Sequence, residues 1–132
     1  MAGMTVRLDG QRLALRKDPA MMTTINKSIT EKIAWMVHRI AESFHPQKII
    51  LFGSYARGTA TDDSDVDLLV VMEVKGPKRQ LITEIDLALA DRELPMDLLI
   101  VRPDEICKYK DIVGHILYPV LREGKVVYDA TV

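Results

Sequence analysis

The sequence predicts an α/β (α+β) fold in which a small mixed β-sheet is flanked by helices. Short apolar runs typical of buried strands alternate with longer stretches of helical periodicity, the pattern of helices packed on a sheet. The length agrees, because 132 residues of which 48% are hydrophobic can bury the core of one domain. The sequence contains no repeats, low-complexity tracts or internal linker.

Residues 1–22 differ from the rest of the chain because they lack helical periodicity. Asp9-Gly10 lies between two short alternating runs, which is a hairpin signal. A loosely attached leader fits these residues equally well. We therefore expect an N-terminal leader or hairpin over 1–22 and one main domain over 23–132.

The first regular element that we expect is a helix over 28–45. Ser28 and Glu31 have the spacing of a capping box, and Pro46 ends the pattern. Apolar residues recur between them at helical spacing, namely Ile29, Ile33, Val37, Ile40 and Phe44.

Two apolar runs, 48–52 and 66–72, are expected to form buried strands on either side of a short connection. The connection should contain a short helix over 54–57 and a polar loop over 59–64. The second run contains consecutive leucines and valines, which favours burial on both faces of a sheet.

The remaining elements follow a turn at Gly76-Pro77. We expect a helix over 78–91, a strand over 97–101 and a helix that begins at Pro103. A last helix should precede a strand over 126–128, and Pro119 must start, kink or interrupt that helix. Its expected apolar face consists of Ile112, Ile116, Val120 and Leu121.

The charge balance limits the possible function. The 18 basic and 19 acidic residues give a net charge of −1, which argues against strong nucleic-acid binding but not against a nucleotide. The single cysteine, Cys107, cannot form an internal disulfide, which suits a reducing compartment. No apolar stretch approaches the roughly 18 residues of a membrane span. We therefore expect a cytoplasmic protein that is not held in a membrane.

Gly53-Ser54 follows the first apolar run and is a candidate phosphate-binding turn. A strand that ends in a glycine turn and a helix start exposes backbone N–H groups, which favour an anion. Gly53 permits close approach, and the Ser54 hydroxyl adds a donor. Such dipeptides are common in ordinary turns, so this signal alone is weak.

Asp65 and Asp67 provide the second part of the motif. In a strand, residues two apart point to the same face, and a divalent cation relieves the repulsion between two carboxylates there. A solvated acidic run that includes Asp62 and Asp63 is the alternative. A calcium loop would need further regularly spaced ligands, which are absent, and metal-dependent sugar transferases usually need a larger domain.

Asp97 is a candidate third carboxylate, because it begins the apolar run that follows Pro95. If the strand over 97–101 neighbours the strand over 66–72, Asp97 converges on the metal site. Taken alone, an aspartate that faces water at a strand edge is equally compatible with the sequence.

These residues resemble the nucleotidyltransferases of the DNA polymerase β superfamily, in particular their minimal, single-domain MNT-type members. The resemblance rests on Gly53-Ser54, Asp65-Val66-Asp67 and Asp97, with Arg57 and Gly58 after the glycine turn. It spans about residues 28–128, so 23–132 would be the nucleotidyltransferase domain.

The resemblance implies a role for each residue of the motif. Asp65 and Asp67 would hold two Mg²⁺ ions, and Asp97 would bind one of them and help to deprotonate the attacking hydroxyl. Gly53-Ser54 would grip the phosphates of a nucleoside triphosphate, in this case ATP. Arg57 would neutralise phosphate charge, although a surface ion pair with a loop aspartate is equally compatible with the sequence.

The resemblance also implies a partner. Minimal members commonly act as antitoxins that transfer AMP to a tyrosine of a HEPN-type RNase toxin. Two alternatives stay open: an antitoxin that masks its toxin without catalysis, and a transferase with a small-molecule or RNA acceptor. A homo-oligomer and a hetero-oligomer are both compatible with the sequence.

Overall fold

The computed structural model describes residues 28–131. They belong to two compact units, one that ends at Met36 and one that runs from Val37, and each is described by itself. The prediction for 1–22 lies outside the described residues, so the division at residue 22 stays a prediction. Among the described residues, no helix combines the length and apolar character needed to cross a membrane.

Helix α1 (Ile29–Phe44) spans the boundary between the two units. In the first unit, the predicted capping box is confirmed at its start. The Ser28 N–H donates to Glu31 Oε1 at 3.0 Å, and the Glu31 N–H donates to Ser28 Oγ at 3.1 Å. These two bonds satisfy backbone donors that a helix start leaves without partners.

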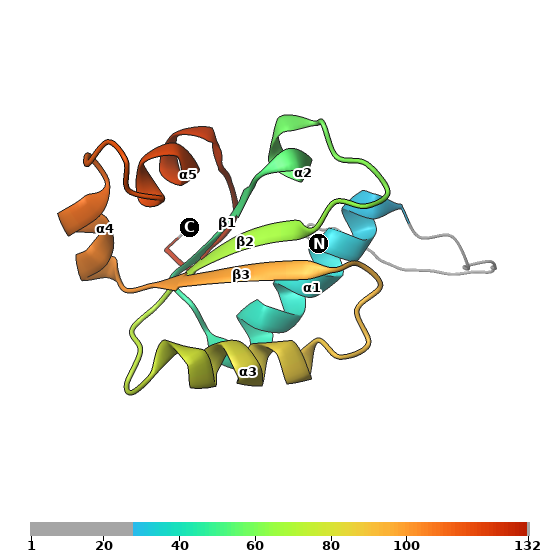
Figure 1. Ribbon diagram of the computed structural model, residues 1–132. Coiled ribbons are helices and arrows are strands. Elements are labelled where there is room, and N and C mark those ends of the chain that lie inside the picture. The colour runs from blue at the N-terminus through green and yellow to red at the C-terminus, as the bar shows by residue number, and fades with distance from the viewer. Residues whose placement is uncertain (1–27, 132) are drawn as a thin grey trace. The chain divides into compact units, whose positions relative to one another are not determined.

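The second unit is built on a four-stranded mixed sheet with the strand order β3-β2-β1-β4 (Figure 1). Strand β1 pairs antiparallel with β2 and β4, whereas β2 and β3 are parallel. Helix α3 crosses between the two parallel strands, as a parallel connection requires. The elements are β1 (Lys48–Phe52), α2 (Ser54–Arg57), β2 (Val66–Val71), α3 (Lys78–Ala88), β3 (Met96–Val101), α4 (Pro103–Tyr109), α5 (Leu117–Glu123) and β4 (Lys125–Asp129).

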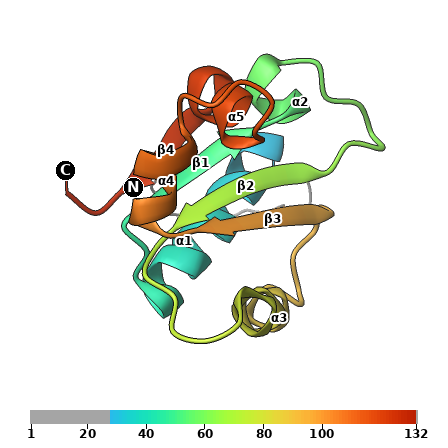
Figure 2. The same cartoon turned by 60° about the vertical axis from the view of Figure 1, so that its left-hand side comes forward.

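Helices cover both faces of this sheet. Helix α3 lies on one face, and α5 lies on the other (Figures 1 and 2). The central strand β2 is therefore buried along nearly its whole length, which confirms the burial predicted for this apolar run. The mixed sheet and its flanking helices confirm the predicted fold class.

Two details of the helices differ from the predictions. Helix α3 ends at Ala88 instead of residue 91, because the chain turns there and the Arg92 side chain donates to the Leu89 carbonyl at 3.1 Å. Ile112 and Ile116 do not belong to the apolar face of a helix: they lie in turns before α5 and are 49% and 52% exposed.

Pro119 explains this second difference. It is the third residue of α5 and thus lies in the first turn, at the start of the helix, as one of the predicted alternatives allowed. A proline is tolerated in the first turn but its ring clashes with the carbonyl four residues earlier inside a helix. A helix that included Ile112 could therefore not continue through this position.

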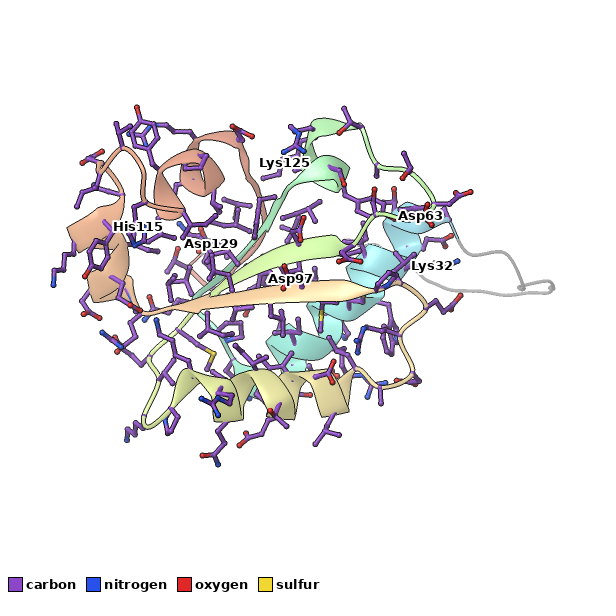
Figure 3. The ribbon with its side chains drawn as sticks, viewed as in Figure 1. Lys32, Asp63, Asp97, His115, Lys125 and Asp129 are labelled. Carbon is purple, nitrogen blue, oxygen red and sulfur yellow. The ribbon has the colours of Figure 1, made fainter. Side chains whose placement is uncertain are left out.

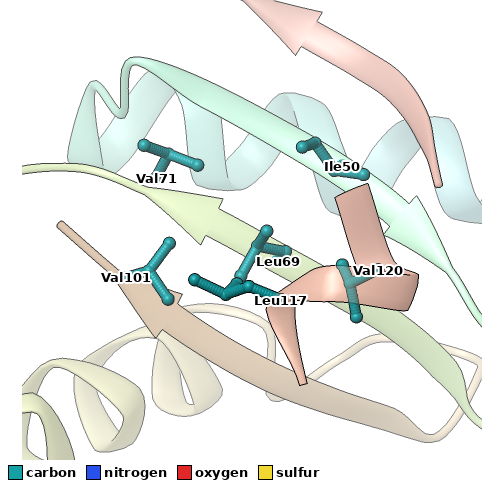
Figure 4. Packing of buried hydrophobic residues seen from close by; sticks show 6 residues of the cluster. All are labelled: Ile50, Leu69, Val71, Val101, Leu117 and Val120. Atoms are coloured by element: carbon teal, nitrogen blue, oxygen red, sulfur yellow. The ribbon is translucent and has the colours of Figure 1, made fainter. Parts of the chain in front are cut away.

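The core between the sheet and α5 is a cluster of aliphatic side chains (Figure 4). Leu117 and Val120 of α5 pack on residues from three strands, and Leu117 is fully buried. The strand residues of this cluster are Ile50, Leu69, Val71 and Val101.

We expect Leu117→Ala to destabilise the protein by about 2–5 kcal/mol, because it removes buried methyl groups and leaves a cavity. Urea unfolding followed by circular dichroism measures this loss. Leu87→Ala is the control, since Leu87 lies on α3 and is 68% exposed. An equal loss in both variants would contradict the packing described for α5.

Candidate active site

The predicted site residues meet at one end of the sheet, where β1 ends and β2 and β3 begin. The antiparallel pairing places Phe52 opposite Asp67, and the parallel pairing places Asp67 opposite Asp97. Residues in register on neighbouring strands point to the same face, at a strand spacing of about 4.8 Å. The structure thus brings Asp67 and Asp97 together, as expected if their strands were neighbours.

Gly53 is shaped by this arrangement. It has φ +75°, a conformation that L side chains rarely adopt, and a Cβ at this position would overlap the Asp67 carboxylate. The missing Cβ therefore makes room for a carboxylate of the neighbouring strand, a role that the sequence did not reveal. Only glycine lets Asp67 occupy this place.

The turn at Gly53 leads directly into α2. The N–H groups of Ala56 and Arg57 both donate to the Gly53 carbonyl at 3.1 Å. The N–H groups of Ser54 and Tyr55, at the start of the helix, have no acceptor within it. Because α2 has only four residues, its dipole is small, and these N–H groups with the Ser54 hydroxyl are the donors available to an anion.

The three aspartates share one electrostatic environment. Burial raises the pKa of Asp67, repulsion from Asp97 and Asp65 raises this pKa further, and Arg57 opposes the shift. Asp65 and Asp97 themselves are exposed, whereas Asp67 is half-buried. Asp97 projects from the edge strand β3, and Asp63 lies in the loop before β2 (Figure 3).

These carboxylates suit a divalent cation. Within residues 28–131, no three acidic, histidine or cysteine side chains stand together as a preformed metal-binding group. Mg²⁺ does not require one, since it usually binds through one or two carboxylates together with waters and substrate phosphates. The adjacent Asp67 and Asp97, with the negative charge of Asp65 nearby, fit such a hard cation.

Arg57 reaches Glu123, a residue that the sequence reasoning missed. Its Nη1 lies 3.7 Å from Glu123 Oε1 at the end of α5, so its partner is not a loop aspartate such as Asp62 or Asp63. The charge of Arg57 also opposes the rise in the pKa of Asp67. No sequence motif connects residues so far apart; only the packing of α5 beside α2 could have revealed the pair.

Comparison with known families agrees with this geometry. Residues 33–118, well over half of the chain, match the model of the nucleotidyltransferase domain family. The chain belongs to this family. The nucleotidyltransferase match includes all six predicted site residues but stops before Glu123.

Known relatives match over short segments. Two proteins of Methanocaldococcus jannaschii, each named "Putative protein adenylyltransferase", are 64% identical over 28 residues and 67% identical over 33 residues. These segments cover 21% and 25% of this nucleotidyltransferase, and 28% and 22% of the relatives. The matches thus span less than a third of the length of either relative.

A solved structure is also similar to this chain. It is the crystal structure of a "putative nucleotidyltransferase" from Sulfolobus solfataricus, which is 21% identical. The alignment covers 83% of this nucleotidyltransferase and 94% of the other chain, with a TM-score of 0.47. Nucleotidyltransferases of the matched family generally use a nucleoside triphosphate and a divalent metal ion.

Proposed function

We propose that this nucleotidyltransferase is an MNT-type antitoxin that transfers AMP from ATP to a tyrosine hydroxyl of a HEPN-type RNase toxin. The observation that carries the proposal is the register of Asp67 and Asp97 beside the Gly53 turn. This register supports the proposal, because two carboxylates that could hold a metal and accept a proton lie next to backbone donors that could bind phosphate. The names of the two archaeal relatives support protein as the acceptor class.

The phosphate side of the site consists of the Ser54 hydroxyl, the first N–H groups of α2 and the Arg57 guanidinium. These groups would bind the β- and γ-phosphates and hold the α-phosphate toward β2 and β3. Asp65, Asp67 and Asp97 would hold Mg²⁺, with two ions as the family resemblance implies. Bound there, the metal supplies neutralisation of the phosphate charge.

The acceptor side is formed by Asp97. The hydroxyl oxygen of the acceptor attacks the α-phosphorus, the bond between this phosphorus and the bridging oxygen to the β-phosphate breaks, and pyrophosphate leaves. The proton of the hydroxyl passes to the Asp97 carboxylate, which acts as the general base. Asp97 is exposed on an edge strand, so the hydroxyl of a separate protein can reach it.

Incubation with ATP labelled at the α-phosphate tests this function. The protein receives Mg²⁺ and a HEPN-type toxin protein as the candidate acceptor, and we expect the label on a tyrosine of that partner. Asp65→Asn/Asp67→Asn should abolish labelling, whereas Asp63→Asn, which changes an exposed loop carboxylate, should retain it.

The other outcomes identify the alternatives. Complete neutralisation of the toxin by the double variant, without transfer of label, would replace catalysis by masking. Label found only on RNA or on an aminoglycoside would replace the protein acceptor. A chelator such as EDTA should stop transfer by the wild-type protein, and transfer that continues in EDTA would contradict the metal requirement.

A further inference from the structure

The Arg57–Glu123 pair links the candidate phosphate site to the C-terminal part of the chain. Its two charged atoms are 3.7 Å apart, and the side chains are 52% and 54% exposed. A half-exposed ion pair at this distance contributes little to stability. Its position beside the site therefore matters more than its contribution to folding.

Close contacts hold the backbone next to Glu123 and the backbone of Arg57 in place. A Cβ on Gly124 would lie within 2.5 Å of the Ile50 side chain and of the Val120 carbonyl oxygen. The Gly124 N–H also donates to that carbonyl at 2.8 Å, so the end of α5 is held close against β1. Arg57 is held by its own N–H bond to the Gly53 carbonyl. Glu123 thus meets Arg57 from a defined direction.

Asp67 is a second carboxylate in the surroundings of Arg57: it lies against Gly53, to whose carbonyl the Arg57 N–H donates, and the charge of Arg57 opposes the rise in its pKa. Glu123 therefore competes with Asp67 for the same guanidinium. A carboxylate beside a triphosphate site also repels the substrate, which is unfavourable unless the carboxylate has another effect. Holding Arg57 away from Asp67 is such an effect, because it leaves Asp67 free for a cation.

We propose that Glu123 is a positioning residue: it draws the Arg57 guanidinium away from Asp67, so that Arg57 meets the triphosphate and Asp67 meets the metal. The inference rests on the proposed function, because it takes Arg57 as a phosphate contact. Glu123 touches neither substrate nor metal and acts only through Arg57. Without it, Arg57 pairs with Asp67, and both ATP and Mg²⁺ must break that pair before they bind.

Glu123→Gln tests this role in the full chain with ATP and Mg²⁺. We expect the KM for ATP and the Mg²⁺ concentration at half-maximal rate each to rise about 2- to 5-fold, the range of a half-exposed ion pair. The kcat should change less than 2-fold, and Glu123→Asp should restore part of the loss. Asp86→Asn is the control, because Asp86 lies on α3 and forms a 3.0 Å ion pair with Arg92, which follows that helix.

A double-mutant cycle shows whether the effect passes through Arg57. In an Arg57→Gln background, Glu123→Gln should change neither constant. The same increase in KM with and without Arg57, or a lower KM in Glu123→Gln, would overturn the inference. These results are distinct from failure of the proposed function, in which the wild-type protein itself would neither bind ATP with Mg²⁺ nor transfer AMP.

Discussion

Replacing Gly53 with alanine is expected to lower the rate of nucleotidyl transfer by about 100-fold and to destabilise the fold by about 2–4 kcal/mol. The added Cβ overlaps the Asp67 carboxylate, so Asp67 must move, and a displacement of about 1 Å at a reacting centre can cost this much. The destabilisation combines the strain of a positive φ with overpacking. Steady-state kinetics and urea unfolding measure the two effects.

Gly76→Ala is the matched control for this variant. Gly76 has φ +90°, but a Cβ there would meet no atom within 4 Å. It should therefore lose only about 1 kcal/mol from backbone strain and retain full activity. Equal losses of activity and stability in the two variants would show that the close approach of Asp67 to Gly53 is not important for function.

Asp67→Asn is expected to change activity and stability in opposite directions. The rate of transfer should fall by roughly 10³-fold or more, because the variant loses a carboxylate that is expected to hold the metal together with Asp65 and Asp97. The metal-free protein should nevertheless melt about 1–4 °C higher at pH 7, since the substitution removes a desolvated charge beside Asp97 and Asp65. Calorimetry in EDTA measures the second effect.

The difference in melting temperature between Asp67→Asn and the wild type should depend on pH, because the pKa of Asp67 is raised. The folded protein keeps the proton of this carboxyl to a higher pH than the unfolded chain does. The stability that the protonated group contributes is therefore complete below the unfolded value of 3.8 and is lost as the pH rises through the folded pKa. The advantage of Asp67→Asn should thus be absent at pH 3 and present at pH 7.

Mg²⁺ should make the wild type melt at a higher temperature than Asp67→Asn, the reverse of the order in EDTA. By binding the folded state, the ion should stabilise the wild type, whereas Asp67→Asn should respond weakly. Asp63→Asn serves as the control, because its exposed carboxylate lies in the loop before β2. If Asp67→Asn melts at a lower temperature than the wild type in EDTA at pH 7, the charge of Asp67 does not destabilise the metal-free protein.

Much of the fold could be predicted because local patterns are strong here. The strand over 48–52 and the helix over 54–57 have the predicted bounds, since a buried run, a glycine and a helix start follow one another directly. The sequence alone does not show that the strands of Asp67 and Asp97 are neighbours. The structure shows this parallel pairing, which sets Asp67 opposite Asp97. Pairing between distant strands leaves no local signal.

The parts that could not be predicted depend on long-range packing. The spacing of Ile112, Ile116 and Val120 is helical, but Pro119 sets the start of α5 and leaves the first two exposed. Glu123 carries no signature of its own, because its relation to Arg57 arises only when α5 packs beside α2. The contact of Gly53 with Asp67 likewise requires the register of β1 and β2.

The strand order has a consequence for when activity can arise during folding. β1 and β2 are consecutive and can pair early, whereas β3 must add to β2 after the crossover through α3, and β4 returns to β1 last along the chain. Closing longer loops costs more entropy, so such contacts form more slowly. A chain in which only β1 and β2 had paired would have the glycine turn and Asp67 but would lack Asp97 opposite Asp67. The candidate site is therefore complete only after β3 has paired with β2.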